Sequence, residues 1–548
     1  MAAFIFVIKT KSNYSLNPLT RIHLFFTFGS NQSIGYVRYV YIFSVIAIFV
    51  LLIACINFMN LSTARSETRA KEIGMRKVVG ANRKNVISQF LGESLLLAFM
   101  ALCFAVVLII ILLPAFNSIS GKNLEFSFLG SRTFLIGIIS ITLFTGIISG
   151  SYPALFLSSF KPVHTLHGSK VRISNRSPLR KTLVVIQFAL SIFLIIGTAV
   201  VYNQLNYMKN RNLGFDKDNL LCIRMTGETP QSYLTIKNEL IKHTNIMGIT
   251  ASGRRPSVTG DTGRNINWDG KDPNKHVKVV FHTIDYDYPE QLKIKMAEGR
   301  SYSKNFPPDT TGAFVINEEL AKLMGSGSPI GKNFSIFWMK GKIIGVMKNY
   351  NHLPLHANIE PMVFLLPPNP YWLSTIFVKI QPGNIEPTLK HIKKTWQNIV
   401  PDYPFDYSFL DEDYDRMYRV EKRLGTLLNY FAFLAVLIAC LGLFGLASFT
   451  TEQRTKEIGI RKTLGASEAK IVMMLSTEFV KWVALANLIA WPAAWFVLNN
   501  WLNDFAYSTK LHVGIFFLAG MLAMLIALLT FVLPAADTYQ QNFNNRTE

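Results

Sequence analysis

The chain has 548 residues, of which half are apolar and 16% are charged, and its formal net charge is +22. Residues 206–424 hold 29 Lys/Arg and 23 Asp/Glu, whereas the rest of the chain holds 27 and 11. The excess positive charge therefore lies beside the apolar runs, which is typical of a membrane topology signal and argues against nucleic-acid binding. The four cysteines form no Cys-x-x-Cys motif, so no disulfide framework is expected.

Long apolar runs are the first feature met along the chain. A helix needs about 20 apolar residues to cross the hydrocarbon core of a bilayer. Seven runs meet or approach this length, at about 40–62, 94–115, 133–157, 182–204, 426–449, 479–501 and 513–534. The sequence therefore predicts an α-helical polytopic membrane protein of about seven spans, with one long polar segment between the fourth and fifth.

The charges between the spans predict the topology. Residues 64–92 carry seven Lys/Arg against two Glu, 158–181 carry six and no acid, and 451–477 carry five against three. By the positive-inside rule these three segments are cytoplasmic. Segment 205–424 is then extracytoplasmic, the N-terminus is external and the C-terminus is cytoplasmic.

An internal repeat relates the two ends of the chain. Residues 67–81 read ETRAKEIGMRKVVGA and residues 452–466 read EQRTKEIGIRKTLGA, with ten of fifteen positions identical at an offset of 385. The same offset pairs Cys55 with Cys440 and Glu93 with Glu478. Each copy follows one span and precedes another, so the chain contains a duplicated membrane unit.

The repeated segment reads as a short charged helix between two spans. Gly80 and Gly465 suit the C-terminal end of such a helix. Ile73 and Met75, with Ile458 and Ile460 in the second copy, can dip toward the acyl boundary. One interpretation is an amphipathic helix that only anchors the bundle. The other is a docking surface for a cytoplasmic partner, which the recurrence of the same charged residues and glycines favours.

The polar segment 205–424 predicts an α/β domain. Strand-like runs lie near 219–225, 277–284, 313–316, 342–347, 361–366 and 375–380, and helix-like runs near 232–243, 316–324 and 385–399. Residues 327–333, GSPIGKN, resemble a phosphate loop only superficially, because Ser326 and Asn333 stand where the motif needs Gly and Ser or Thr. The acidic residues at 411–415 suit a solvated helix start. No catalytic motif, cofactor site or metal site is predicted, and the pair His352 and His356 lacks further ligands.

The motifs of the chain, taken together, resemble those of the FtsX/MacB-type ABC transporter permeases. EIGMRKVVGA and EIGIRKTLGA lie between spans as in that family. EGRSYS (298–303), INEELAKLMG (316–325), IGKNF (330–334) and the run 342–364 follow the order of the MacB-like extracytoplasmic core domain. FDYSFLDEDYDRMY (405–418) and SYPALFLSSFKPVHTL (151–166) also fit. By this analogy 300–370 forms a lobe inserted into a split platform.

The resemblance implies a mechanical function. Such permeases pair with a cytoplasmic ABC ATPase, so the chain itself is expected not to be an enzyme and to need no cofactor of its own. The coupling helices would be 67–81 and 452–466. Their candidate contact residues are Glu72, Gly74, Arg76, Lys77, Gly80, Glu457, Gly459, Arg461, Lys462 and Gly465. The expected location is the bacterial inner membrane, where the chain contacts lipid and, in some members of the family, a membrane-fusion protein or other envelope partner.

The resemblance also gives domain boundaries. A two-unit member has eight spans, so residues 1–38 are expected to be the remnant of a first extracytoplasmic domain in an N-terminally truncated chain. The first membrane unit is 39–160, followed by a linker at 161–181, a span at 182–204, the core domain at 205–424, the second unit at 425–536 and a tail at 537–548.

Three functional classes remain open at this stage. The first is an export or extrusion permease for a peptide, drug or lipoprotein. The second is a non-transporting regulator or sensor of the FtsX kind that signals to envelope partners. The third, an ion-coupled carrier, is disfavoured because the spans carry almost no charge in their middle.

Overall fold

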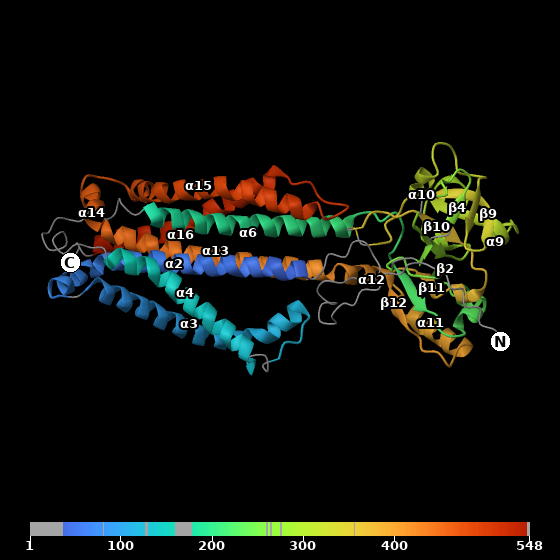
Figure 1. Cartoon of the computed structure of the whole chain (residues 1–548), viewed down its shortest axis with the longest axis horizontal. Helices are drawn as coiled ribbons and strands as arrows, with labels where there is room; N and C mark the ends of the chain where they lie inside the picture. Colours follow the sequence, from blue (N-terminus) through green and yellow to red (C-terminus); the bar gives the residue numbers. More distant parts are fainter. Residues whose placement is uncertain are drawn as a thin grey trace. The chain divides into compact units, whose positions relative to one another are not determined.

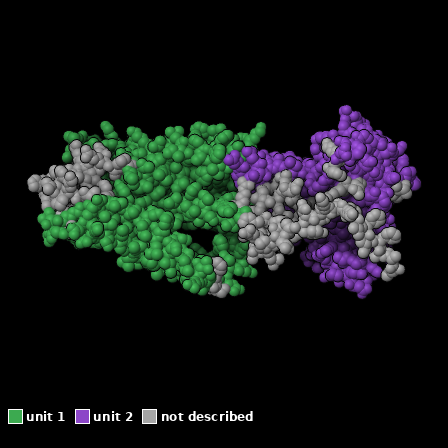
Figure 2. Space-filling model, in the orientation of Figure 1, with its two compact units in different colours: residues 1–202, 423–499, 510–548 green, residues 203–422, 500–509 purple. Residues whose placement is uncertain are grey.

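The computed structural model describes residues 37–544, apart from 81, 126–129, 159–177, 259–260, 264–265, 275–276, 354 and 356. The chain divides into two compact units, one of 1–202, 423–499 and 510–548 and one of 203–422 and 500–509 (Figure 2). The remnant predicted at 1–38 and the linker predicted at 161–181 lie almost entirely outside the described residues, as does the end of the tail 537–548.

Long apolar helices make up the first unit, which is called the membrane unit from here on. Among the described residues, seven helices are long and apolar enough to cross a bilayer, which confirms the predicted number. The helices, labelled in Figure 1, are α2 (Val37–Val78), α3 (Arg83–Ser120), α4 (Arg132–Ser158), α6 (Pro178–Asn210), α13 (Arg419–Gln453), α14 (Thr455–Thr463), α15 (Glu468–Leu502) and α16 (Val513–Asn544). All of them except α14 contain a candidate span.

The two copies of the repeat meet along α2 and α13. Asn57 on α2 donates from Nδ2 to the carbonyl of Ile438, 3.4 Å away, and a Cβ added at Gly442 would lie 2.2 Å from Asn57 Oδ1. Residues 57 and 442 are equivalent at the offset of 385. Further along, Leu61 packs on Gly445. Contact between equivalent positions on parallel helices is the property of an interface about a two-fold axis.

The second unit is an α/β domain with two sheets. Its strands are β1 (Leu220–Arg224), β2 (Ile246–Ser252), β3 (Asp261–Gly263), β4 (Ile266–Trp268), β5 (Val279–Thr283), β6 (Met296–Gly299), β7 (Ala313–Asn317), β8 (Asn333–Ile336), β9 (Met339–Met347), β10 (Met362–Leu365), β11 (Thr375–Ile380) and β12 (Tyr407–Phe409). The short helices are η3 (Thr229–Ser232), α7 (Tyr233–Leu240), α8 (Tyr288–Gln291), α9 (Asp309–Gly312), α10 (Glu318–Leu323), η4 (Pro370–Trp372), α11 (Ile385–Ile399) and α12 (Leu410–Met417).

The smaller sheet has the order β12-β1-β11-β2 and is antiparallel throughout. Helices α7 and α11 cover one face, where Ile236 and Trp396 pack on Leu221 and Ile376. Successive side chains of β1 point to opposite faces of the sheet. Leu220 and Cys222 therefore pack in a second hydrophobic core on the other face. The strand, helix and strand expected over 375–410 are present as β11, α11 and β12.

The larger sheet has the order β3-β5-β10-β7-β9-β8-β4, with β6 paired to β9. Both faces are buried, one in the core shared with Cys222 and one beneath α10, where Leu320 packs on Phe314. The sheet begins at Asp261. The inserted lobe predicted at 300–370 is therefore too short, because β3, β4 and β5 belong to the same sheet through pairing with strands far along the chain.

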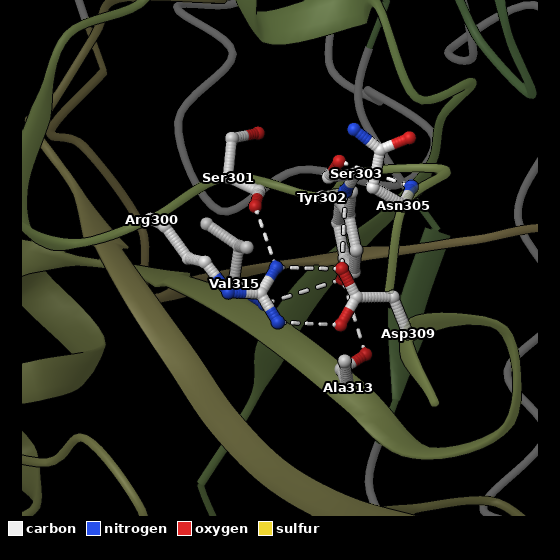
Figure 3. Close-up of polar contacts among 8 residues, drawn as sticks. All are labelled: Arg300, Ser301, Tyr302, Ser303, Asn305, Asp309, Ala313 and Val315. Atoms are coloured by element: carbon white, nitrogen blue, oxygen red, sulfur yellow. Dashed lines mark hydrogen bonds and ion pairs between the residues drawn. The ribbon is translucent and has the colours of Figure 1, made fainter. Parts of the chain in front are cut away.

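An ion pair fixes the loop between β6 and β7 (Figure 3). Arg300 donates to both carboxylate oxygens of Asp309, at 2.6 and 2.8 Å, and the Asp309 side chain is only 2% exposed. Burial disfavours the ionised carboxylate, but the hydrogen bonds from Arg300 and from the Ser303 amide outweigh it and lower the pKa of Asp309. The neighbouring Tyr302 hydroxyl donates to the Phe364 carbonyl at 2.7 Å. The EGRSYS motif thus has a structural role, because its side chains and backbone hold the loop between β6 and β7 in place.

Replacing Asp309 with Asn should destabilise the domain by about 2 kcal/mol, because Arg300 loses its charged partner while the shape is kept. The comparison is the urea midpoint of the full chain in detergent, followed by hydrogen exchange of the β7 amides. The matched control is Asp402→Asn, an exposed carboxylate whose loss should leave the midpoint unchanged. Equal midpoints for both variants would contradict the structural assignment.

Two buried histidines lie in the core between the sheets. The rings of His282 and His352 meet edge to face with centroids 5.5 Å apart. Among the described residues, none is hydrogen bonded to a ring nitrogen of either histidine. Burial lowers the pKa of His282 to about 4, and burial together with the neighbouring His282 lowers the pKa of His352 to about 3. Both rings are therefore neutral at pH 7.

Stability of the domain should fall as the pH drops below about 6.5, the pKa of an unfolded histidine. In that range the unfolded chain binds protons that the folded domain excludes, so each histidine should cost about 2 kcal/mol at pH 5. The measurement is hydrogen exchange of the β5 amides in the full chain at pH 7.5 and pH 5. The variant His282→Phe with His352→Leu should lose most of this pH dependence, and an unchanged dependence would refute the assignment.

Candidate functional site

The two repeated segments, 67–81 and 452–466, are the candidate functional site and are called the interspan segments. In the first copy the segment is not a separate short helix, as predicted, but the end of α2, which runs unbroken from the span to Val78. In the second copy α13 ends at Gln453 and the separate helix α14 follows. The following helices α3 and α15 begin at equivalent positions, Arg83 and Glu468.

Both interspan segments end in the same backbone conformation. Gly80 has φ of +103° and Gly465 has φ of +86°, values that L side chains rarely adopt. A Cβ at either position would meet no atom within 4 Å, so the conformation and not crowding explains the glycine. The turn lets the chain reverse into the next span, and it places the last helical residues at the tip of the unit.

The charged side chains repeat the same contacts. Arg76 pairs with Glu72 at 2.6 Å and Arg461 pairs with Glu457 at 2.8 Å, one helical turn apart in each case. Each arginine also reaches the following helix at an equivalent position, Gln89 in the first copy and Met474 in the second. The two copies therefore agree in side-chain arrangement as well as in sequence.

The apolar side chains divide into a buried and an exposed set. Ile73 and Ile458 are buried in the protein, so the expectation that they dip into lipid is wrong. Ile73 packs on Val86, Phe90 and Ala154 of α3 and α4.

Five other apolar side chains of the interspan segments are exposed, and four of them form matched pairs. Met75 and Ile460 are 57% and 63% exposed, and Val79 and Leu464 are 82% and 81% exposed. Each segment thus presents two matched apolar side chains beside an ion pair, and the first segment also exposes Val78.

The lysine of the first copy has an internal contact. Lys77 donates to the Ser158 carbonyl at 2.7 Å, and Arg83 donates to the Ser158 hydroxyl at 3.2 Å. The first bond attaches the interspan segment to the end of α4, and the second attaches the start of α3 to the same residue. The side chain of Lys462, the equivalent residue of the second copy, lies outside the described residues. Gly74 and Gly459 lie inside the helical stretches.

Sequence reasoning missed Val79 and Leu464, the most exposed apolar residues of the two segments. The signal was present, since both stand one residue before the repeated Gly-Ala pair. The pair is not among the ten identical positions of the repeat, because one residue is Val and the other is Leu. The contacts of Lys77 with residue 158 had no sequence signal.

Other candidate sites take structural roles. The loop 327–333 leads into the strand β8, whereas a phosphate loop opens a helix. Asp411, Glu412 and Asp413 stand in the first turn of α12, but Asp413 is nearly buried and pairs with Arg255 at 2.9 Å. Among the described residues, no three His, Cys, Asp or Glu side chains gather as metal ligands, and His356 lies outside that part of the chain.

Comparison with known families agrees with this symmetry. Residues 44–162 and 429–543 match the family described as FtsX-like permease C-terminal. The two matched ranges begin 385 residues apart (429 − 44), which is the offset of the repeat. The chain therefore carries two copies of the FtsX-like permease domain. Each matched range contains one interspan segment with the helices on both sides of it.

Characterised and uncharacterised relatives share parts of the permease. The macrolide export ATP-binding/permease protein MacB of Campylobacter jejuni (strain 81-176) is 30% identical over 122 residues, which is 22% of this chain and 18% of that protein. The uncharacterized ABC transporter permease YknZ of Bacillus subtilis is 24% identical over 222 residues, which is 38% of this chain and 55% of that protein. The matched stretches thus span about a fifth to a half of these relatives.

Solved structures related to the same proteins cover the α/β domain. The periplasmic region of MacB from Actinobacillus actinomycetemcomitans is 16% identical with a TM-score of 0.28, covering 38% of this chain and 97% of that one. The extracellular domain of the noncanonic ABC-type transporter YknZ from Gram-positive bacteria is 16% identical with a TM-score of 0.26, covering 34% and 97%.

The exposed tips of the permease should be reachable from one side of the membrane only. Cysteines replacing Val79 and Leu464 should react with a membrane-impermeant maleimide in inverted vesicles and not in intact spheroplasts. A cysteine replacing the exposed Lys242 of the α/β domain should show the reverse. The parent chain, with its own four cysteines, sets the background. Labelling of both regions from the same side would contradict the predicted topology.

Proposed function

We propose that this permease is the membrane subunit of an ABC transporter and that a cytoplasmic ABC ATPase docks on both interspan segments. The main support is the agreement of the two copies in exposed side chains, ion pairs and terminal glycine φ angles. Two equivalent surfaces suit an ATPase that acts as a pair of similar subunits. The contact residues proposed are Glu72, Arg76, Glu457 and Arg461 with the exposed apolar pairs beside them.

Energetics favour docking over simple anchoring. The Glu72–Arg76 and Glu457–Arg461 pairs are about half exposed, so each contributes at most about 0.3–0.5 kcal/mol to helix stability. This contribution to helix stability is too small to explain why the same ion pair is present in both copies. The exposed Val79 and Leu464 lie beyond the helices and add nothing to the core of the unit. These side chains gain a role only when a partner covers them.

The packing provides a route for motion. A partner that displaces the first segment moves Ile73, which is wedged between α3 and α4. It also moves the whole of α2, since the segment and the span are one helix of 42 residues, about 63 Å long. In the second copy Arg461 contacts α15 through Met474. The proposed function is therefore transmission of ATPase motion through helices that act as rigid levers.

The proposal assigns ATP hydrolysis to the partner and export or extrusion of a substrate to the assembled transporter. The name of one relative, a macrolide export protein, supports the drug among the predicted substrate classes of peptide, drug and lipoprotein. A membrane-fusion protein or another envelope partner would complete the path outside the inner membrane. A regulator that transmits motion without transport shares the same docking surfaces, and a transport assay with the assembled complex distinguishes the two.

Exchanging the charges within each pair tests docking separately from helix stability. The variant Glu72→Arg with Arg76→Glu, combined with Glu457→Arg and Arg461→Glu, keeps both intrahelical pairs but reverses the surface charge. We expect it to lower stimulation of the partner ATPase at least tenfold while the chain still inserts and folds, because charge reversal on a docking surface is strongly unfavourable. The readout is ATPase rate in nanodiscs as a function of permease concentration.

The matched control is Arg132→Glu, which reverses an exposed charge at the far end of α4 and should leave stimulation unchanged. If the exchanged pairs restore full stimulation while the single change Arg76→Glu abolishes it, the pairs only stabilise the helices and the docking proposal fails.

A further inference from the structure

A cleft in the α/β domain is lined by arginines. Its volume is about 470 Å³, which lies within the range of sites for small ligands. Four guanidinium groups and one carboxylate are among the lining groups, with hydroxyl side chains between them. The lining residues are Arg224, Arg254, Arg255, Val258, Ser374, Thr375, Asp406, Tyr407, Ser408 and Arg416.

The strand register explains why these residues meet. Arg224 is the last residue of β1 and lies directly opposite Thr375, the first residue of β11. Two residues earlier, Cys222 lies opposite Ser408 of β12. Because side chains alternate along a strand, Arg224 shares the sheet face of Cys222 and Ser408. The loop after β2 adds Arg254 and Arg255, and α12 adds Arg416.

Neighbouring acids hold two of the arginines in place. Arg255 donates from Nη1 to both Asp413, at 2.9 Å, and Ser408, at 2.7 Å. Arg254 donates to Asp261 from Nε at 2.9 Å. Neither Asp261 nor Asp413 lines the cleft. A guanidinium has five N–H donors, so a fixed arginine keeps free donors for a ligand. Within the described structure, Nη1 is the one nitrogen of the Arg255 guanidinium that makes a hydrogen bond.

The other two arginines are less engaged. Arg416 lies 3.7 Å from Asp413 and 3.8 Å from Glu412, beyond hydrogen-bond distance in both cases. Arg224 is exposed and forms no ion pair with any described residue. The acids that accompany Arg254, Arg255 and Arg416 lie outside the lining, so guanidinium groups predominate among the charged groups that face the cleft, with Asp406 as the one lining carboxylate.

We propose that this cleft binds a small anionic ligand through its carboxylate or phosphate oxygens. Arg224 and Arg255 would donate to the anion, since planar guanidinium groups match the two oxygens of either group. The hydroxyls of Thr375 and Tyr407 would supply further bonds. Asp406 would favour a ligand that also carries a donor. This site is independent of the proposed ATPase docking, because it lies wholly within the α/β domain.

Binding of inorganic phosphate and of succinate to the full chain in detergent tests the proposal. Calorimetric titrations at fixed ionic strength, balanced with sodium chloride, should show saturable binding of at least one probe. Phosphate binding alone identifies a phosphate ligand, and succinate binding alone identifies a carboxylate ligand. Absence of saturable binding for both, or binding that sodium chloride reproduces, overturns the proposal.

Variants locate the site. Arg224→Gln should weaken binding at least tenfold, the typical effect of losing a charge-assisted hydrogen bond. Arg416→Gln is the second cleft variant and should also weaken binding; both side chains are exposed, so the thermal midpoints should be unchanged. Arg419→Gln, an exposed arginine of the same unit outside the cleft, is the control and should bind as the parent does. Unchanged affinity in both cleft variants would exclude this site.

Discussion

The close contact of α2 with α13 is the constraint on which the membrane unit depends. Asn57 occupies the space that a side chain at Gly442 would fill, and the two positions are equivalent in the repeat. Inside a bilayer, helices associate where small residues allow close approach and polar side chains bond across the interface. Because equivalent positions touch, the two FtsX-like units are arranged around a two-fold axis.

The symmetry reaches the interspan segments but is incomplete there. Both end in a left-handed glycine and expose the same two apolar positions. Yet the first is the end of α2, whereas the second is the separate helix α14. In the second copy Arg454 is the one residue between α13 and α14, and backbone hydrogen bonds from Arg454 to Thr450 and from Ile458 to Arg454 continue across it.

Much of the architecture was predictable from the sequence. Seven apolar runs give the spans because a bilayer demands length and hydrophobicity and little else. The repeat gives the interspan segments, and short continuous apolar runs give β1, β7 and β11. The extent of the larger sheet was not predictable, since β3 and β4 have three residues each and are defined only by partners far along the chain.

Side-chain contacts across long separations were also beyond sequence reasoning. The sequence around Lys77 does not predict its hydrogen bond to residue 158. No local sequence pattern predicts that Arg224, Arg255 and Arg416 line the same cleft. The acidic run at 411–415 reads as solvated, but Asp413 faces Arg255 and Ser408. Such contacts depend on how strands and loops pack in three dimensions. The local amino-acid composition does not predict that packing. The contacts within the repeat are an exception. Because the two copies are related by a fixed offset of 385 residues, a contact in one copy predicts the equivalent contact in the other.

The number of ATPase subunits on one permease chain tests the account most directly. Native mass spectrometry of the complex, purified together with its ABC ATPase, gives this number from the intact mass. Two equivalent docking surfaces predict two ATPase subunits per chain, with loss of one subunit when the charges of a single interspan segment are exchanged. A complex that holds one ATPase subunit per chain, or keeps both after that exchange, would contradict the account.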